Sequence, residues 1–302
     1  MSSLEASIGR LSLRNPTMLA SGIMDETAGS FLKVAHAGAG AVVTKSIGSE
    51  PRNGYANPTL IELDEGYINA MGLPNPGIEA FAEEMSEARS CPVPIIGSIF
   101  ASSPKEFAFL ASKMQSYGAA AIELNLSCPH AKGYGMELGV DPEVVAAVVK
   151  EVKSSCSIPV FAKLTPNTHR LLEVAKAVEA AGGDAIVAIN TVKAMAISAE
   201  MRRPILSNKG GGLSGPAIKP IGLRCVYDLR STVKIPIIGA GGVEDWRDAV
   251  EYIMAGASAV QVGSGVGRNG LQVFEAICSG MEAFMEREGF GSVRQMVGVA
   301  HE

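Results

Sequence analysis

Short runs of β-branched and small apolar residues recur along the chain, and stretches with helical patterning separate them. This alternation is typical of parallel βαβ units. The runs that predict strands are 18–20, 41–45, 94–98, 121–125, 160–164, 185–190, 236–239 and 259–262. Eight such repeats close a barrel without an open edge, so the pattern predicts an α/β fold: one (β/α)8 TIM-barrel domain over residues 1–302.

Residues at the expected helix ends support this interpretation. A glycine follows four of the helical stretches and precedes alanine-rich sequence, as a C-terminal helix cap does: Gly38, Gly118, Gly182 and Gly256. Proline fits the first turn of a helix, where its missing N–H has no partner, and three pairs fit this pattern: Ser103-Pro104, Asp141-Pro142 and Gly215-Pro216.

Three segments fall outside the simple repeat. Residues 7–13 predict a small hairpin that turns at Gly9 and Arg10 and closes the bottom of the barrel. Residues 46–76, after the second strand, and 191–215, after the sixth, are too long for simple connections. Long ordered loops in a compact domain are usually lids or substrate walls.

Polar residues at the carboxyl ends of barrel strands face the active site in this fold. Two lysines, Lys45 and Lys163, and two asparagines, Asn125 and Asn190, are expected there, together with Ser98. A single lysine at such a position can extend to solvent. Two charged side chains at one barrel mouth each need a counter-charge, which favours a binding site.

The last two strands end in glycine-rich loops, at residues 239–242 and 263–267. Loops after strands seven and eight hold phosphate groups in many such barrels. Residues 265–270 also spell GxGxxG, but no βαβ unit follows, so a phosphate cradle is favoured over a dinucleotide fold. The loops predict a phosphorylated ligand without identifying it.

The five cysteines are scattered and include no CxxC pair, which argues against a metal or iron-sulfur site within this chain. Four of them are expected to be small buried hydrophobes: Cys91, Cys156, Cys225 and Cys278. Cys128 differs because it follows the fourth strand, over the barrel mouth. The residues alone leave open whether it is reactive or structural.

The chain of 302 residues carries a formal net charge of -5. It therefore has no basic excess to drive nucleic-acid binding. No apolar run near the N-terminus has signal-peptide length, and no later run approaches the ~20 residues of a membrane span. These features predict a cytoplasmic protein that binds neither nucleic acid nor membrane.

Taken together, these motifs resemble the dihydroorotate dehydrogenase family, the flavin mononucleotide (FMN) barrel enzymes of pyrimidine biosynthesis. The similarity runs over nearly the whole chain. The matching segments are 20–22, 44–46, 69–75, 125–129, 163–166, 190–191, 212–216, 239–242 and 262–263.

The resemblance implies that FMN lies across the barrel mouth, with its phosphate on Gly241, Gly242, Gly263 and Ser264. Lys163 would lie beside N1 and O2 of the ring, where a fixed cation stabilises the reduced flavin. The remaining cofactor contacts that it implies are Ala20, Ser21, Gly22, Lys45, Ser46, Asn125 and Gly215.

On the substrate side, the resemblance implies oxidation of dihydroorotate to orotate. Cys128 would be the base that takes a proton from C5, while a hydride leaves C6 for flavin N5. The implied substrate contacts are Lys45, Asn69, Met71, Gly72, Leu73, Asn125, Asn190 and Thr191. His130 stands where many members have an asparagine that contacts the substrate; it could hydrogen-bond the ligand or shift the pKa of Cys128.

Within the family, the chain is most similar to the soluble class 1B, NAD-linked catalytic subunits. Membrane-bound members use serine in place of Cys128 and carry an extra N-terminal helical segment. Residues 139–142 and 210–219 resemble class 1B. This implies a homodimer that joins an electron-transfer subunit carrying FAD and an iron-sulfur cluster, forming a heterotetramer.

Four alternatives remain at this point. One is a fumarate-linked class 1A enzyme, and another is an FMN-dependent reductase of a different pyrimidine or of tRNA uridine. A third is a cofactor-free isomerase or lyase that binds a sugar phosphate in the same cradle. The last is a barrel that serves only as a binding subunit.

Overall fold

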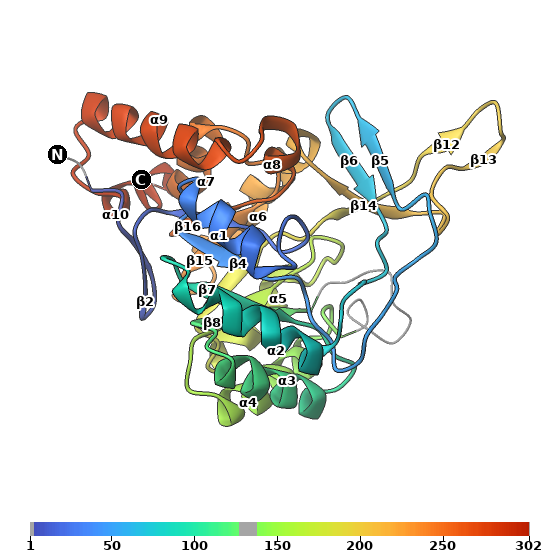
Figure 1. Ribbon diagram of the computed structural model, residues 1–302. Helices are drawn as coiled ribbons and strands as arrows, with labels where there is room; N and C mark the ends of the chain where they lie inside the picture. Colours follow the sequence, from blue (N-terminus) through green and yellow to red (C-terminus); the bar gives the residue numbers. More distant parts are fainter. Residues whose placement is uncertain (1–2, 127–137, 302) are drawn as a thin grey trace.

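The computed structural model describes residues 3–126 and 138–301 of the chain. Its centre is a closed barrel of parallel strands with helices around the outside (Figure 1). The strands follow the order β10, β15, β16, β3, β4, β7, β8 and β9, and the last pairs with the first. The predicted (β/α)8 barrel is therefore confirmed.

Each barrel strand coincides, to within about two residues at either end, with one of the runs expected from the sequence. The bounds are β3 (Thr17–Leu19), β4 (Ala41–Val43), β7 (Ile95–Ile99), β8 (Ala121–Asn125), β9 (Val160–Lys163), β10 (Ala185–Ala188), β15 (Ile237–Ala240) and β16 (Ala259–Val262).

Side chains along each strand alternate between the barrel interior and the surrounding helices. In β8, Ala121 belongs to the cluster inside the barrel, whereas Ile122 and Leu124 pack in the cluster that contains the helices. Glu123 and Asn125 share the face of Ala121, so this strand directs two polar side chains inward.

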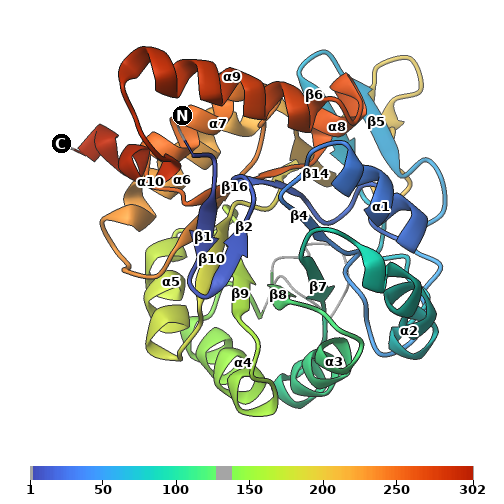
Figure 2. The ribbon, with the colours of Figure 1, turned by 60° about the vertical axis from the view of Figure 1, so that its left-hand side comes forward.

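The N-terminal segment forms the expected hairpin from β1 (Ala6–Ile8) and β2 (Leu11–Leu13). Ile8, Leu11 and Leu13 are buried among the first interior side chains of the barrel strands, such as Ala41. Figure 2 shows the hairpin in front of the barrel. It closes the amino ends of the strands and leaves the carboxyl ends open to a ligand.

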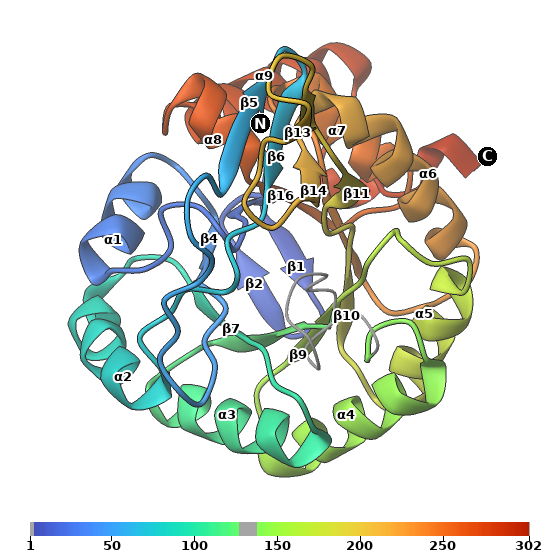
Figure 3. The same ribbon diagram turned by 90° about the vertical axis from the view of Figure 1, so that its right-hand side faces the viewer.

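The helices occupy the intervals between the strands, as Figure 3 shows around the barrel. Their bounds are α1 (Ala28–His36), α2 (Ile78–Glu87), α3 (Pro104–Ser116), α4 (Pro142–Ser155), α5 (Leu171–Ala180), α6 (Lys219–Arg230), α7 (Trp246–Met254), α8 (Ser264–Asn269), α9 (Val273–Glu288) and α10 (Val293–Met296). Short 3-10 turns are η1 (Ala88–Ser90), η2 (Pro216–Ile218) and η3 (Val299–His301).

The predicted helix boundaries hold for most of these elements. Ser103 and Asp141 cap α3 and α4 through their side chains. The four expected glycines follow α1, α3, α5 and α7 with positive φ: Gly38, Gly118, Gly182 and Gly256. The start expected at Gly215 and Pro216 is the 3-10 turn η2, and α6 begins only at Lys219.

The two long connections pair with each other. β5 (Leu60–Leu63) and β6 (Gly66–Asn69) come from the first, and β11 (Val192–Ala194) and β14 (Gly211–Ser214) come from the second. They form one antiparallel sheet in the order β11, β14, β6 and β5, in which Asn69 pairs with Gly212. The hairpin of β12 (Ile197–Ser198) and β13 (Arg203–Pro204) extends beyond this sheet (Figure 1).

None of the helices in the described part of the chain has the length and apolar character needed to cross a membrane.

Candidate active site

A cavity of about 560 Å³ lies at the carboxyl ends of the barrel strands. Its wall contains nearly all the binding residues that the sequence led us to expect within the described chain: Ala20, Ser21, Gly22, Lys45, Ser46, Asn69, Met71, Gly72, Leu73, Asn125, Lys163, Asn190, Thr191, Gly241, Gly242, Gly263 and Ser264. Gly215 is the exception. It lies behind the wall, where its carbonyl oxygen would be 2.7 Å from a Cβ added to Gly242.

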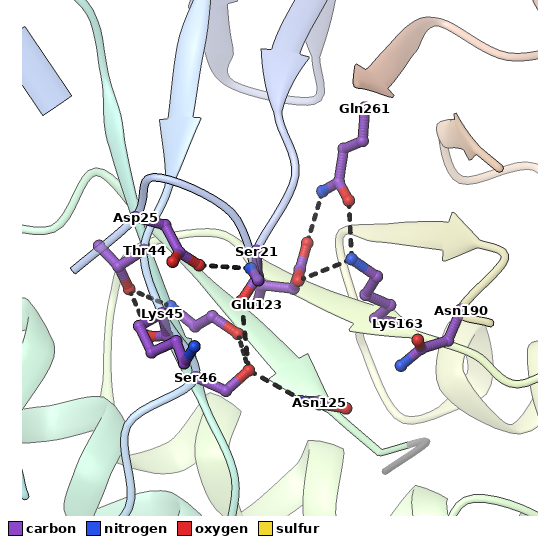
Figure 4. A network of polar contacts seen from close by, with 12 residues as sticks. Ser21, Asp25, Thr44, Lys45, Ser46, Glu123, Asn125, Lys163, Asn190 and Gln261 are labelled. Atoms are coloured by element: carbon purple, nitrogen blue, oxygen red, sulfur yellow. Dashed lines mark hydrogen bonds and ion pairs between the residues drawn. The ribbon is translucent and has the colours of Figure 1, made fainter. Parts of the chain in front are cut away.

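Three buried side chains form a closed polar triangle on the floor of this cavity (Figure 4). The Nζ atom of Lys163 donates to Oε1 of Gln261 at 2.9 Å, and Nε2 of Gln261 donates to Oε2 of Glu123 at 2.6 Å. The third side is an ion pair of 3.5 Å between Nζ of Lys163 and Oε1 of Glu123. Glu123 is therefore the counter-charge that Lys163 needs.

Lys45 has a different counter-charge, at the edge of the site. Its Nζ atom lies 3.1 Å from Oε1 of Glu26. Its backbone N–H donates to the carbonyl of Asp25, and the Asp25 carboxylate accepts from the N–H of Gly22. Burial raises the pKa of Asp25, while the Lys45 ammonium opposes that rise. Asp25 thus joins the loop after β3 to the end of β4.

A cluster of hydroxyl groups lies beside Lys45. Oγ of Ser46 is 2.9 Å from Oγ of Ser98 and 3.3 Å from Oγ of Ser21. Nδ2 of Asn125 donates to Oγ of Ser46 at 3.0 Å (Figure 4). Ser98, which we expected at the barrel mouth, is fully buried behind Ser46. These bonds fix the Asn125 amide relative to β4.

The glycine loops form the side of the cavity next to β15 and β16. Gly241 and Gly242 have φ values of +118° and +71°, which few residues other than glycine adopt. The hydroxyl of Tyr252 donates to the Gly241 carbonyl at 2.7 Å and so holds this loop from behind. The two loops contribute Gly241, Gly242, Gly263 and Ser264 to the cavity wall, and glycine lets the backbone approach an anion closely, as a phosphate cradle requires.

Other parts of the wall carry amide and hydroxyl groups from the long connections and from the end of β10. Nδ2 of Asn69 lies 3.4 Å from the carbonyl oxygen of Gly212, which is a long contact. Oδ1 of Asn190 accepts from the Thr191 N–H at 2.7 Å, and Nδ2 of Asn167 donates to the Thr191 carbonyl at 3.0 Å. Asn69, Asn190 and Thr191 thus line the same cavity as the glycine loops.

A family model described as dihydroorotate dehydrogenase matches residues 3–285. The chain belongs to the dihydroorotate dehydrogenase family. The resemblance carried by the sequence motifs is therefore confirmed.

Two relatives, from Thermoplasma acidophilum and Thermococcus kodakarensis, are each 54% identical to this chain. The first aligns over 300 residues, covering 99% of both chains, and the second over 299 residues, covering 99% of this chain and 98% of the relative. A relative from Methanocella arvoryzae is 50% identical over 293 residues, which are 97% of this chain and 96% of the relative. All three are named dihydroorotate dehydrogenase B (NAD(+)), catalytic subunit.

Among solved structures, the crystal structure of DHODH in complex with ferulenol from Eimeria tenella has a TM-score of 0.86 to this chain. The structural alignment covers 99% of this chain and 89% of the Eimeria tenella chain, at 21% sequence identity. At this identity the similarity shows a shared fold.

Two expected features of this dihydroorotate dehydrogenase family member fall outside the described residues: Cys128, the expected base, and His130. Strand β8 ends at Asn125 on the cavity wall, three positions before Cys128 in the sequence. Of the other cysteines, Cys156 is buried as expected, whereas Cys91, Cys225 and Cys278 are only partly buried and pack against the core. Burial still raises the pKa values of Cys225 and Cys278 to about 11. Such thiols stay protonated near neutral pH, which agrees with a structural role.

Sequence reasoning missed Glu123 and Gln261, although both line the cavity. A signal was available in the strands themselves, because Glu123 is two residues before Asn125 and Gln261 is two residues before Gly263. Residues two apart on a strand share a face. Among residues 3–126 and 138–301, no cluster of three or more histidine, cysteine, aspartate or glutamate side chains is arranged to hold a metal ion.

Proposed function

We propose that this chain is an FMN-dependent dihydroorotate dehydrogenase that oxidises dihydroorotate to orotate in pyrimidine biosynthesis. The observation that carries the proposal is a single cavity that is lined both by Lys45, Lys163 and Asn125 and by two glycine loops. The names of relatives at 54% identity support the same substrate.

The residues of the cavity fit FMN. The glycine loops offer backbone N–H groups to a phosphate, and a Cβ on Gly242 would meet backbone atoms of the wall. The volume of about 560 Å³ lies within the range of roughly 300–1,000 Å³ typical of small-molecule sites. The Lys163 ammonium on the floor would stabilise negative charge on the reduced cofactor. FMN, when bound, would accept the hydride that leaves C6 of dihydroorotate.

The remaining cavity residues bind and orient the substrate. The Lys45 ammonium pairs with the substrate carboxylate, and the amides of Asn69, Asn125 and Asn190 pair with the pyrimidine dione. The backbone from Met71 to Leu73, with Thr191, completes the wall on the same side. Fixed donors and acceptors of this kind orient a flat polar ring without moving during the reaction.

Cys128 takes the proton from C5 as the general base. A thiolate is the competent form, so the proton it accepts leaves the site as the thiol is deprotonated again. Because β8 ends at Asn125, the substrate-binding amide and the base belong to one short stretch of chain.

NAD receives the electrons through a second subunit that carries FAD and an iron-sulfur cluster. In the described part of the chain, β16 is followed only by helices, so the glycine-rich sequence at 265–270 opens no βαβ unit for a dinucleotide. The words "catalytic subunit" in the relatives' names support such a partner. The term "NAD(+)" in the same names favours the NAD-linked class over a fumarate-linked one.

An exposed apolar surface near β12 and β13 supports assembly into a homodimer. It comprises Met195, Ile197, Met201 and Ile205, all of which are exposed. Apolar groups gathered on a surface commonly mark a protein contact. Sedimentation of the isolated chain tests this: Ile197→Lys should be monomeric, whereas Phe109→Lys, at an exposed apolar residue of α3, should sediment like wild type.

The function itself is tested by purifying the chain with whatever cofactor it retains. We expect a yellow protein that releases FMN on denaturation and forms orotate from dihydroorotate with an artificial dye. A colourless protein that binds a sugar phosphate would instead support the cofactor-free alternative. NAD reduction should require the partner subunit, and efficient turnover with fumarate by the isolated chain would contradict the NAD-linked assignment.

A further inference from the structure

Glu123 is a fully buried carboxylate in the interior of the barrel, and the substrate and cofactor contacts described above do not use it. Its Oε2 atom accepts from Gln261 at 2.6 Å. Its Oε1 atom accepts no hydrogen bond from any described residue and lies 3.5 Å from Nζ of Lys163. Figure 4 shows the carboxylate in contact with both of the other side chains.

The layer of side chains just below this triangle is apolar. It includes Ala121 two residues before Glu123, Phe161 two residues before Lys163, and Ala259 two residues before Gln261. Burying a carboxylate is costly, and apolar residues of similar size often replace buried ion pairs without loss of stability. Packing alone therefore gives no reason for a glutamate at this position.

We propose that Glu123 is a positioning residue for the flavin reaction: with Gln261 it holds the Lys163 ammonium at the cavity floor and reduces the positive charge that the bound flavin experiences. This inference rests on the proposed binding of FMN. It concerns the reduction potential of the bound flavin, which is independent of the identity of the substrate.

The geometry gives Lys163 and Glu123 different places relative to the ligand. The Lys163 side chain is 8% exposed and that of Glu123 is 0% exposed, so the ammonium is the member of the pair closer to the open cavity. A lysine has three N–H donors, and Gln261 occupies one of them. The remaining donors can contact a ligand, while the carboxylate acts on the ligand from behind the ammonium.

The sign of the effect follows from the charges. Glu123→Gln keeps the shape of the side chain and removes its negative charge, so Lys163 presents more positive charge and the flavin potential rises. Lys163→Met removes the ammonium, so the potential falls. In this proposal Glu123 acts on the flavin through the Lys163 ammonium that it holds. Adding Glu123→Gln to Lys163→Met therefore causes no further shift.

The experiment compares flavin reduction potentials of the purified holoproteins, measured by equilibrium reduction against a reference dye without dihydroorotate. The variants are Glu123→Gln, Lys163→Met, the double variant and Glu173→Gln. Glu173 is an exposed residue of α5 that pairs with Arg170 at 2.9 Å and does not line the cavity, so it controls for loss of one negative charge. We expect opposite shifts for the first two variants, no added shift in the double variant, and the wild-type potential for the control.

The proposal would be overturned if Glu123→Gln had the wild-type flavin potential. It would also be overturned if Glu123→Gln shifted the potential equally with Lys163 present and with Lys163→Met. If Glu123→Gln retains no flavin, its potential cannot be measured, and flavin retention is then compared in Glu123→Asp, which keeps the negative charge. Retained flavin in the aspartate variant would support a requirement for the negative charge, and loss of flavin in both would overturn it. If dihydroorotate fails to reduce a wild-type flavin whose potential is measurable, the proposed substrate fails while this inference stands.

Discussion

The Nζ atom of Lys45 lies 3.1 Å from Oε1 of Glu26, and the two side chains differ in exposure: Lys45 is 10% exposed and Glu26 is 63% exposed. Lys45 lines the cavity, so an incoming carboxylate and Glu26 would compete for one ammonium. Lys163, in contrast, has its counter-charge buried behind it. The charge of Lys45 is therefore paired with an exposed carboxylate that a ligand can displace, whereas the charge of Lys163 is paired with a buried carboxylate that stays in place.

We expect Glu26→Gln to lower the KM for dihydroorotate by up to about fivefold, with kcat changed by less. Glu26 is the exposed member of the pair, and a pair with a solvated carboxylate contributes up to about 1 kcal/mol, which sets this limit. Steady-state assays with an artificial dye at low ionic strength measure the effect. Glu79→Gln removes another exposed carboxylate, 2.8 Å from Lys113, that does not line the cavity, and should leave KM unchanged. A raised KM in Glu26→Gln would show that Glu26 helps to bind substrate.

Cys128→Ala should lower the rate of flavin reduction by dihydroorotate by about 10² to 10⁴, the usual contribution of a general base. FMN should stay bound, because the glycine loops are unchanged. Stopped-flow absorbance measures the rate, and wild-type turnover should rise with pH towards the ordinary thiol pKa of about 8.5. Cys225→Ala is the control, since burial raises the pKa of that thiol to about 11. Reduction at the wild-type rate in Cys128→Ala would exclude Cys128 as the base.

Asp25→Asn should become more stable relative to wild type as pH rises. Burial raises the pKa of Asp25 above its ordinary value of 3.8, so the folded chain holds this proton more tightly than the unfolded chain. The resulting stabilisation is present below the unfolded pKa and is lost as pH rises through the folded pKa. Asparagine has no such dependence and can still accept the Gly22 N–H. Urea unfolding from acid to neutral pH measures the difference, and a difference that is constant with pH would contradict this account.

Gly242→Ala should weaken FMN binding by about tenfold or more, because an added Cβ would lie 2.7 Å from the Gly215 carbonyl oxygen and force the loop to move. Fluorescence titration of the apoprotein with FMN measures the affinity. Gly118→Ala is a matched control, since Gly118 also has positive φ but an added Cβ there would meet nothing within 4 Å. Unchanged FMN affinity in Gly242→Ala would exclude this loop from the cradle.

The sequence predicted the barrel well because its signals are local. The short apolar run of β8 and the glycine that follows α3 are each readable within a few residues. The N-terminal hairpin was readable for the same reason, from the turn at Gly9 between two short apolar runs. The strand ends then identified the two lysines, Asn125, Asn190 and the glycine loops without knowledge of the ligand, whereas Asn69 and residues 71–73 followed only from the family resemblance.

Contacts that depend on closure of the barrel could not be predicted in this way. Glu123 and Gln261 are separated by 138 positions and lie on β8 and β16, which are not neighbours in the barrel. To predict this contact from the sequence, one would have to know that both side chains point into the barrel and that the two strands lie across the barrel from each other. The sheet that joins the long connections is similar, because Asn69 and Gly212 are 143 positions apart.

The most direct test of the function is anaerobic mixing of the purified holoprotein with dihydroorotate in a stopped-flow spectrometer, with orotate measured in the product. We expect the flavin absorption band to be lost in a single turnover, with one orotate formed for each flavin reduced. A bound flavin that dithionite reduces but dihydroorotate does not, with no orotate formed, would contradict the assignment of this chain as a dihydroorotate-oxidising subunit.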